Sequence, residues 1–167
     1  MFFKEFFMAV SNYLSVTGIV QSVSNQSDNC CNLQVSLITE NGIVNLIVTP
    51  ETYVVNNLRL MRGMSIIAFY DADAPAVLIF PPQYRALVIA QKSPREFVEL
   101  KYFNDDLVSA DNTLQLNLGS NTMITTANGQ MYSCNPGNQW LLVYYSATTR
   151  SIPPQTTPRR IIVMCGL

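Results

Sequence analysis

One stretch of this sequence recurs in a diverged form near the end of the chain. Residues 69–90 read FYDADAPAVLIFPPQYRALVIA, and residues 144–164 read YYSATTRSIPPQTTPRRIIVM. In both stretches an aromatic pair is followed by Pro-Pro-Gln, then by arginine and an apolar run. Because a recurring sequence usually encodes a recurring structural unit, the chain is predicted to contain one module twice.

The correspondence extends beyond these two stretches. Several apolar and threonine positions are separated by 70 residues, whereas insertions change the spacing to 75 at the aromatic pairs and to 72 at Pro-Pro-Gln. The alternative explanation is the strand-turn-strand texture that unrelated β proteins share. The 70-residue pairs are Leu37 and Leu107, Leu46 and Leu116, Thr52 and Thr122, and Val54 and Ile124.

Strand signals are strong along the chain, and helix signals are scarce. Apolar and polar residues alternate over 32–37 and 114–118, which is the period of a half-buried strand. Asn41-Gly42 and Asn128-Gly129 supply the positive φ angles of tight turns, so both are interpreted as β-hairpin turns. The second copy lacks an obvious counterpart of the whole first hairpin.

The order of these elements resembles that of an OB-fold. Residues 13–23 suit its long first strand, with Gly18 where that strand must bend. We therefore predict an all-β chain of two tandem small OB-like β-barrel or sandwich modules that arose by internal duplication. The expected boundaries are an N-terminal hydrophobic arm at 1–12, a first module at 13–92 and a second, diverged module with a C-terminal tail at 93–167.

The composition disfavours several classes of function. Only 13% of the residues are charged, ten basic residues nearly balance eleven acidic ones, and histidine is absent. A nucleic-acid binder usually carries a basic patch, and most enzymes use histidine as a base. The carboxylate pairs Asp71/Asp73 and Asp105/Asp106 are typical of turns. We predict a protein that is not an enzyme, with no catalytic residue, metal or cofactor.

Four cysteines carry the most informative chemistry, at Cys30, Cys31, Cys134 and Cys165. Without histidine or a Cys-x-x-Cys pair, neither a zinc site nor thiol catalysis is favoured. Neighbours in a strand point to opposite faces, so we expect one of Cys30 and Cys31 to face inward. Two alternatives stay open: incidental free thiols, or disulfide cross-links within the chain or between copies.

Two apolar segments lie outside the expected strands. The proline-rich segment 74–83 should form a stiff loop, and its residues Val77, Leu78, Ile79 and Phe80 either pack locally or contact a partner. In the arm, a helix would gather Phe2, Phe3, Phe6 and Phe7 on one face. These phenylalanines could dock on the same molecule or insert into a neighbouring copy.

No apolar run is long enough to span a membrane, and Lys4 and Glu5 interrupt the apolar start of the chain. We therefore expect no membrane span and synthesis in the cytosol without a signal peptide.

The strings TPETYVV, FYDADAP with PPQY, and TTRSIPPQTTP with IIVM resemble small, uncharacterised OB-like β proteins of clostridia-type spore formers. The similarity extends from Tyr13 to Met164. In general plan, the chain is also similar to subunits of spore coats and endospore appendages. That resemblance implies assembly through terminal arms and cysteines, and a final location on the spore or cell surface.

These observations favour a non-enzymatic structural subunit whose partner is itself, in a homo-oligomer or polymer such as a filament, appendage or spore-surface layer. Arm insertion and disulfides would join the copies. The alternative is an OB-fold binding module for single-stranded nucleic acid or polysaccharide, although the nearly neutral charge disfavours nucleic acid.

Overall fold

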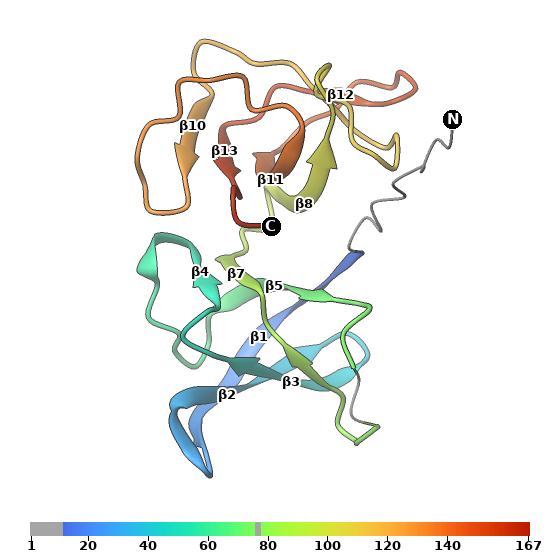
Figure 1. The fold of residues 1–167 in the computed structure, drawn as a ribbon. Helices are drawn as coiled ribbons and strands as arrows, with labels where there is room; N and C mark the ends of the chain where they lie inside the picture. Colours follow the sequence, from blue (N-terminus) through green and yellow to red (C-terminus); the bar gives the residue numbers. More distant parts are fainter. Residues whose placement is uncertain (1–11, 76–77) are drawn as a thin grey trace, which may run out of the picture.

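The computed structural model describes residues 12–75 and 78–167. In this part the chain is all-β, with 50% strand and 2% helix, which confirms the predicted class. Two stacked halves follow one another along the chain, the N-terminal half (12–92) and the C-terminal half (93–167) (Figure 1). The predicted arm residues Phe2, Phe3, Phe6 and Phe7, and Val77 of the predicted contact loop, lie outside the described residues.

The N-terminal half is one seven-stranded sheet with the order β4-β7-β5-β1-β2-β3-β6. The long strand β1 pairs antiparallel with β5 through Tyr13–Ile19 and with β2 through Ile19–Gln26. The elements are β1 (Tyr13–Gln26), β2 (Asn29–Thr39), β3 (Gly42–Val48), β4 (Tyr53–Val54), the 3₁₀ turn η1 (Val55–Asn57), β5 (Ser65–Asp71), β6 (Gln83–Arg85) and β7 (Val88–Gln91).

The C-terminal half contains a four-stranded sheet of order β10-β13-β11-β8 and a two-stranded sheet of β12 and β9. Its strands are β8 (Phe97–Phe103), β9 (Gln115–Leu116), β10 (Met123–Thr126), β11 (Gln139–Tyr145), β12 (Gln155–Thr156) and β13 (Arg160–Val163). Asn41-Gly42 forms the predicted hairpin between β2 and β3. The turn at Asn128-Gly129 brings Thr125 and Met131 into an isolated antiparallel bridge, and Tyr132 N donates to the Ile124 carbonyl at 3.1 Å, but no described strand begins directly after it.

The described sheets do not close into barrels, contrary to our expectation. Closure would require the edge strands β4 and β6 to pair, but β4 is two residues long and bonds only to β7. The apolar segment at residues 85–90, which such a barrel would need as its closing strand, is divided between two strands. Its start belongs to β6, which pairs with β3, and its end belongs to β7, which pairs with β4 and β5.

The two halves contain matching contacts at the positions that correspond in sequence. Thr52 Oγ1 accepts from the Thr49 amide at 3.0 Å and donates to the Ala86 carbonyl at 2.7 Å. Thr122 Oγ1 accepts from the Gly119 amide at 3.1 Å and donates to the Pro158 carbonyl at 2.7 Å. The strand pairings match as well: β4 with β7 and β10 with β13, β5 with β7 and β11 with β13, and β3 with β6 and β9 with β12.

Each half buries a core of its own on one face of its central strands. In β5, Ile66 and Ala68 point into the N-terminal core, and in β11, Leu141 and Val143 point into the C-terminal core. Because side chains alternate along a strand, the residues between them must face the opposite way. These strands are apolar on both faces, which is typical of strands that are covered on both sides.

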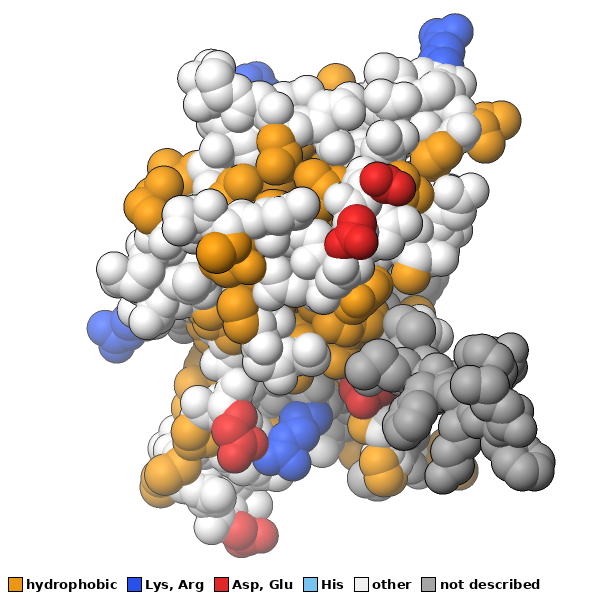
Figure 2. Space-filling view, turned by 45° about the horizontal axis from the view of Figure 1, so that its top comes forward, with side chains coloured by type: hydrophobic (Ala, Val, Ile, Leu, Met, Phe, Trp, Pro, Cys, Tyr) orange, Lys and Arg blue, Asp and Glu red, His pale blue; other side chains and the backbone are white. Residues whose placement is uncertain are grey.

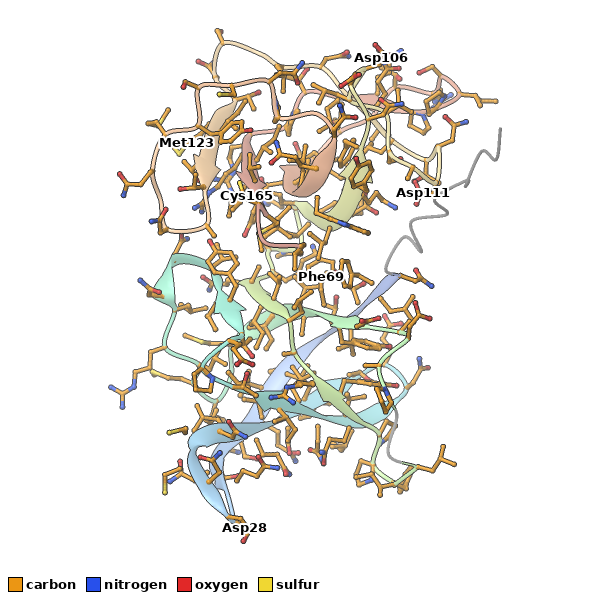
Figure 3. The ribbon with its side chains drawn as sticks, in the orientation of Figure 1. Asp28, Phe69, Asp106, Asp111, Met123 and Cys165 are labelled. Atoms are coloured by element: carbon orange, nitrogen blue, oxygen red, sulfur yellow. The ribbon has the colours of Figure 1, made fainter. Side chains whose placement is uncertain are left out.

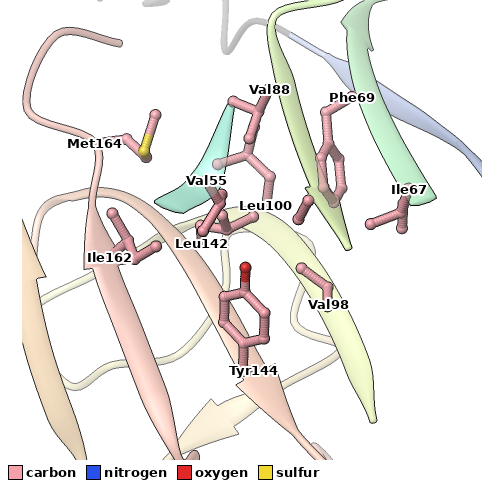
Figure 4. Packing of buried hydrophobic residues seen from close by; sticks show 11 residues of the cluster. Val55, Ile67, Phe69, Val88, Val98, Leu100, Leu142, Tyr144, Ile162 and Met164 are labelled. Atoms are coloured by element: carbon pink, nitrogen blue, oxygen red, sulfur yellow. The ribbon is translucent and has the colours of Figure 1, made fainter. Parts of the chain in front are cut away.

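The opposite faces of these strands meet in a third core between the halves, the junction core (Figure 4). Residues from corresponding positions of both halves belong to it, such as Phe69 and Tyr144, or Ile67 and Leu142. Burial of a large aliphatic side chain stabilises a fold by about 1.5–3 kcal/mol. The members are Val55, Ile67, Phe69, Val88, Ala90, Val98, Leu100, Leu142, Tyr144, Ile162 and Met164.

Gly18 allows β1 to change partners. A Cβ atom placed on Gly18 would lie 2.6 Å from the backbone carbonyl oxygen of Ile38, closer than real contacts permit. Glycine therefore lets β1 approach β2 just before Ile19, where its pairing passes from β5 to β2.

We predict that Gly18→Ala lowers the free energy of unfolding by about 1–3 kcal/mol, because the added methyl group must push β1 away from β2. Urea denaturation measures the change. Gly166→Ala is the matched control, since nothing lies within 4 Å of a Cβ atom there. Equal stability of the Gly18→Ala variant and the parent protein would contradict the close approach.

The junction core should make the two halves unfold together. Leu142 is fully buried in it, so Leu142→Ala is expected to cost about 2–5 kcal/mol, whereas the control Leu118→Ala removes a side chain that is 45% exposed. Circular dichroism and the fluorescence of Trp140, the single tryptophan, should report one common transition for the parent protein. Two separate transitions would show that the junction core does not couple the halves.

Candidate functional site

All four cysteines are exposed and free. Cys30 and Cys31 lie at the start of β2, Cys134 lies between β10 and β11, and Cys165 follows β13. The structure therefore forms no disulfide within the chain among them. Thiols at these separate places on the surface remain accessible to another molecule.

The expectation that one of Cys30 and Cys31 faces inward is wrong. The outer ends of β1 and β2 form a two-stranded ribbon, and nearly every residue of the ribbon near its turn is exposed (Figure 1). Asp28 marks the turn of this ribbon, at the end of the N-terminal half farthest from the C-terminal half (Figure 3). Both faces of the ribbon meet solvent there, so alternation of side chains does not bury either thiol.

The described residues of the predicted contact loop project from the surface. Leu78 is 99% exposed and Phe80 is 93% exposed, and Ile79 is also exposed. Their exposure argues against local packing, which was one of the two interpretations. Monomeric proteins seldom gather such large apolar side chains on one loop without a binding partner.

A corresponding apolar tip occurs in the C-terminal half and was missed by the sequence analysis. Ile152 precedes Pro153 as Phe80 precedes Pro81, and its side chain is 95% exposed. The 72-residue spacing was the signal that could have found it. Each half thus presents one strongly exposed apolar side chain immediately before its Pro-Pro-Gln sequence.

A groove of about 690 Å³ runs beside Phe80 in the N-terminal half. Its floor includes Ile19 and Ile38, which pair across β1 and β2 and are about half exposed. Tyr70 and Tyr84, stacked with ring centroids 4.0 Å apart, line its other side. The groove can accommodate an apolar side chain. On the face of the molecule drawn in Figure 2, few charged side chains interrupt the surface.

A second hollow, of about 330 Å³, is lined by aromatic rings. Trp140 lies edge-on to Tyr13, with centroids 4.5 Å apart, and to Tyr102, with centroids 6.0 Å apart. Lys101 and Asp111 line the same hollow. Aromatic faces beside charged groups suit a ligand with apolar faces and polar edges.

Asp111 is held by several donors. Its Oδ2 accepts from Lys101 Nζ at 2.6 Å, and its Oδ1 accepts from the hydroxyls of Ser109 and Thr113 at 2.7 Å. Partial burial acts to raise the pKa of Asp111, but these hydrogen bonds and the Lys101 charge outweigh it and lower the pKa. The network fixes the carboxylate at the rim of the aromatic hollow.

A third hollow, the junction groove, lies between the halves and has a volume of about 430 Å³. Tyr53, Asn56 and Asn57 line it from the N-terminal half, and the turn 127–129 and Arg160 line it from the C-terminal half. Arg160 Nη1 donates to Asn56 Oδ1 at 2.9 Å. The sequence analysis missed this groove because its residues belong to separate segments without a local motif.

Within residues 12–75 and 78–167, no group of three potential metal ligands (His, Cys, Asp or Glu) comes together, and no helix is long and apolar enough to cross a membrane. No family model matches the chain, and no curated protein matches it. The geometry of these surfaces is therefore the basis for the functional proposal.

The Asp111 network predicts a pH effect. The lowered folded-state pKa means that its stabilisation is present above the unfolded value of about 3.9 and is lost as the pH falls below it. The Asp111→Asn variant should lose less free energy of unfolding at acid pH than the parent protein. The difference should be about 1 kcal/mol or less, because solvent screens the half-exposed carboxylate. Urea denaturation across acid pH measures it. The exposed Asp28→Asn variant is the control, and parent-like pH dependence of the Asp111→Asn variant would refute the role of the network.

Proposed function

We propose that this protein is a non-enzymatic structural subunit that assembles with copies of itself into a filament, appendage or layer, on a spore or cell surface. The exposed apolar tips at Phe80 and Ile152 carry this proposal. Burial of such side chains against another copy would remove them from water, which is the main favourable term in protein association.

The proposed contact joins different surfaces of two copies. The Ile152 tip of one copy enters the groove beside Phe80 of the next copy, where Ile19 and Ile38 supply apolar floor. We propose that each copy offers its tip to one neighbour and its groove to another, which makes the contact heterologous. Repeated heterologous contacts produce a ring or an open filament.

The exposed thiols would lock the assembly after the copies meet. Cys30 and Cys31 on the projecting ribbon are placed to reach a neighbour, and Cys134 and Cys165 are exposed on the C-terminal half. Insertion of the arm with Phe2, Phe3, Phe6 and Phe7 belongs to the same proposal but lies outside the described residues. The Ile152 contact does not require it.

We also propose that the two halves are diverged copies of one module with an OB-like order of elements. The matching threonine hydrogen bonds and strand pairings support the duplication. In this interpretation, the apolar tip before Pro-Pro-Gln is an inherited feature of the module. Its presence in both halves supports a role in contacts beyond local folding.

Sedimentation velocity in reductant tests this contact by measuring the mass of the species that the full chain forms as its concentration rises. The parent protein should associate, and the Phe80→Ser, Ile152→Ser double variant should associate at least about tenfold more weakly, because each truncation removes about 1.5–3 kcal/mol of apolar burial. Non-reducing gels of oxidised parent protein should then show cross-linked species that disappear when reductant cleaves the disulfides.

Met131→Ser is the matched control, since Met131 is exposed and apolar but belongs to neither tip. It should associate like the parent protein. Parent protein that stays monomeric at every concentration, or a double variant that assembles normally, would refute the proposed contact.

A further inference from the structure

Arg160 carries a charge without an acidic partner in the described structure. Its neighbour Arg159 forms a two-pronged pair with Glu96, with nitrogen to oxygen distances of 2.8 and 2.9 Å. Arg160 has no carboxylate within ion-pair distance among the described residues. Its Nε is buried and finds no acceptor there either.

The aromatic neighbours of Arg160 do not neutralise it. The guanidinium lies 5.8 Å from the ring centroid of Tyr144, which is a weak cation–π distance. Burial raises the pKa of Tyr144 to about 12 and also raises the pKa of Tyr53, so both phenols stay neutral near pH 7. Arg160 is only partly buried and lines the junction groove, so its guanidinium can pair with an anion there.

The other side chains of the junction groove also offer donors. Asn56 Oδ1 is engaged by Arg160, and Asn128 Oδ1 accepts from Thr126 Oγ1 at 2.6 Å. Since each amide uses its oxygen in this way, its Nδ2 remains as a donor, and Nδ2 donates to no described residue in either case. Asn56 and Asn128 both line the groove together with Arg160.

We propose that the junction groove binds a small oxyanion, the carboxylate or phosphate group of a ligand, with Arg160 as its charged anchor and Asn56 and Asn128 as further donors. A guanidinium offers paired donors that fit both carboxylate and phosphate oxygens. The anion would pair with the Arg160 charge and connect the two halves across the groove. This site is independent of the apolar tips and of the proposed assembly.

The test is a titration of the full chain with inorganic phosphate and, separately, with acetate, at constant ionic strength set by chloride. Nitrogen-edited NMR follows the side-chain amides of Asn56 and Asn128 and the Nε of Arg160. At least one anion should shift these resonances in a saturable way, and the tighter of the two identifies the preferred group. Absence of saturation with both anions overturns the proposal.

Two variants locate the site. Arg160→Gln should weaken binding by about tenfold or more, whereas Arg150→Gln at an exposed loop position should not. Because Arg160 also packs at the junction, Asn128→Asp provides a variant that keeps a turn-forming residue and adds a negative charge to the groove. It should weaken binding by about tenfold, and Asn41→Asp at the turn between β2 and β3 is its control. Parent-like binding by both groove variants would also overturn the proposal.

Discussion

The junction core is the interaction on which the rest of the structure depends. Strands β5 and β11 carry apolar residues on both faces. The N-terminal half alone would bury Ile66 but expose Ile67, and the C-terminal half alone would bury Leu141 but expose Leu142. Exposure of such a face favours aggregation or unfolding. The other half of the chain covers this face, so each half depends on the other for its burial.

The same packing determines where the other features lie. Corresponding faces meet at the junction, so the η1 turn after β4 and the turn after β10 come to line one groove. Arg160 is the first residue of β13 and lies at this groove. The corresponding position in β7 is Val88. Val88 packs in the junction core, whereas the arginine brings a charge to its edge. Under the proposed duplication, the groove lies at a place where the two halves have diverged.

Periodicity predicted much of the fold, because local patterns encode strands and turns. The alternation in 32–37 and the Asn41-Gly42 turn correctly indicated β2, β3 and their hairpin. Barrel closure was not predictable in this way, since it depends on whether distant edge strands such as β4 and β6 meet. The exposure of Cys30 depends on how far a ribbon extends beyond its core, and the Arg160 groove unites segments with no shared motif. No local sequence pattern predicts the exposure of Cys30 or the position of the Arg160 groove.

The internal pairing also limits how copies can associate. Two separate molecules of a single module could pair symmetrically through the faces that carry Phe69 and Tyr144, but in this chain those faces are already joined. A further copy must therefore use other surfaces, and the apolar ones among the described residues include the two tips and the groove beside Phe80. In the proposed assembly a copy offers its tip to one neighbour and its groove to another, and such heterologous contacts leave an open site at each end. In the proposed assembly, the faces that could pair symmetrically are already joined within each chain. This favours continued growth over an assembly that stops at a dimer.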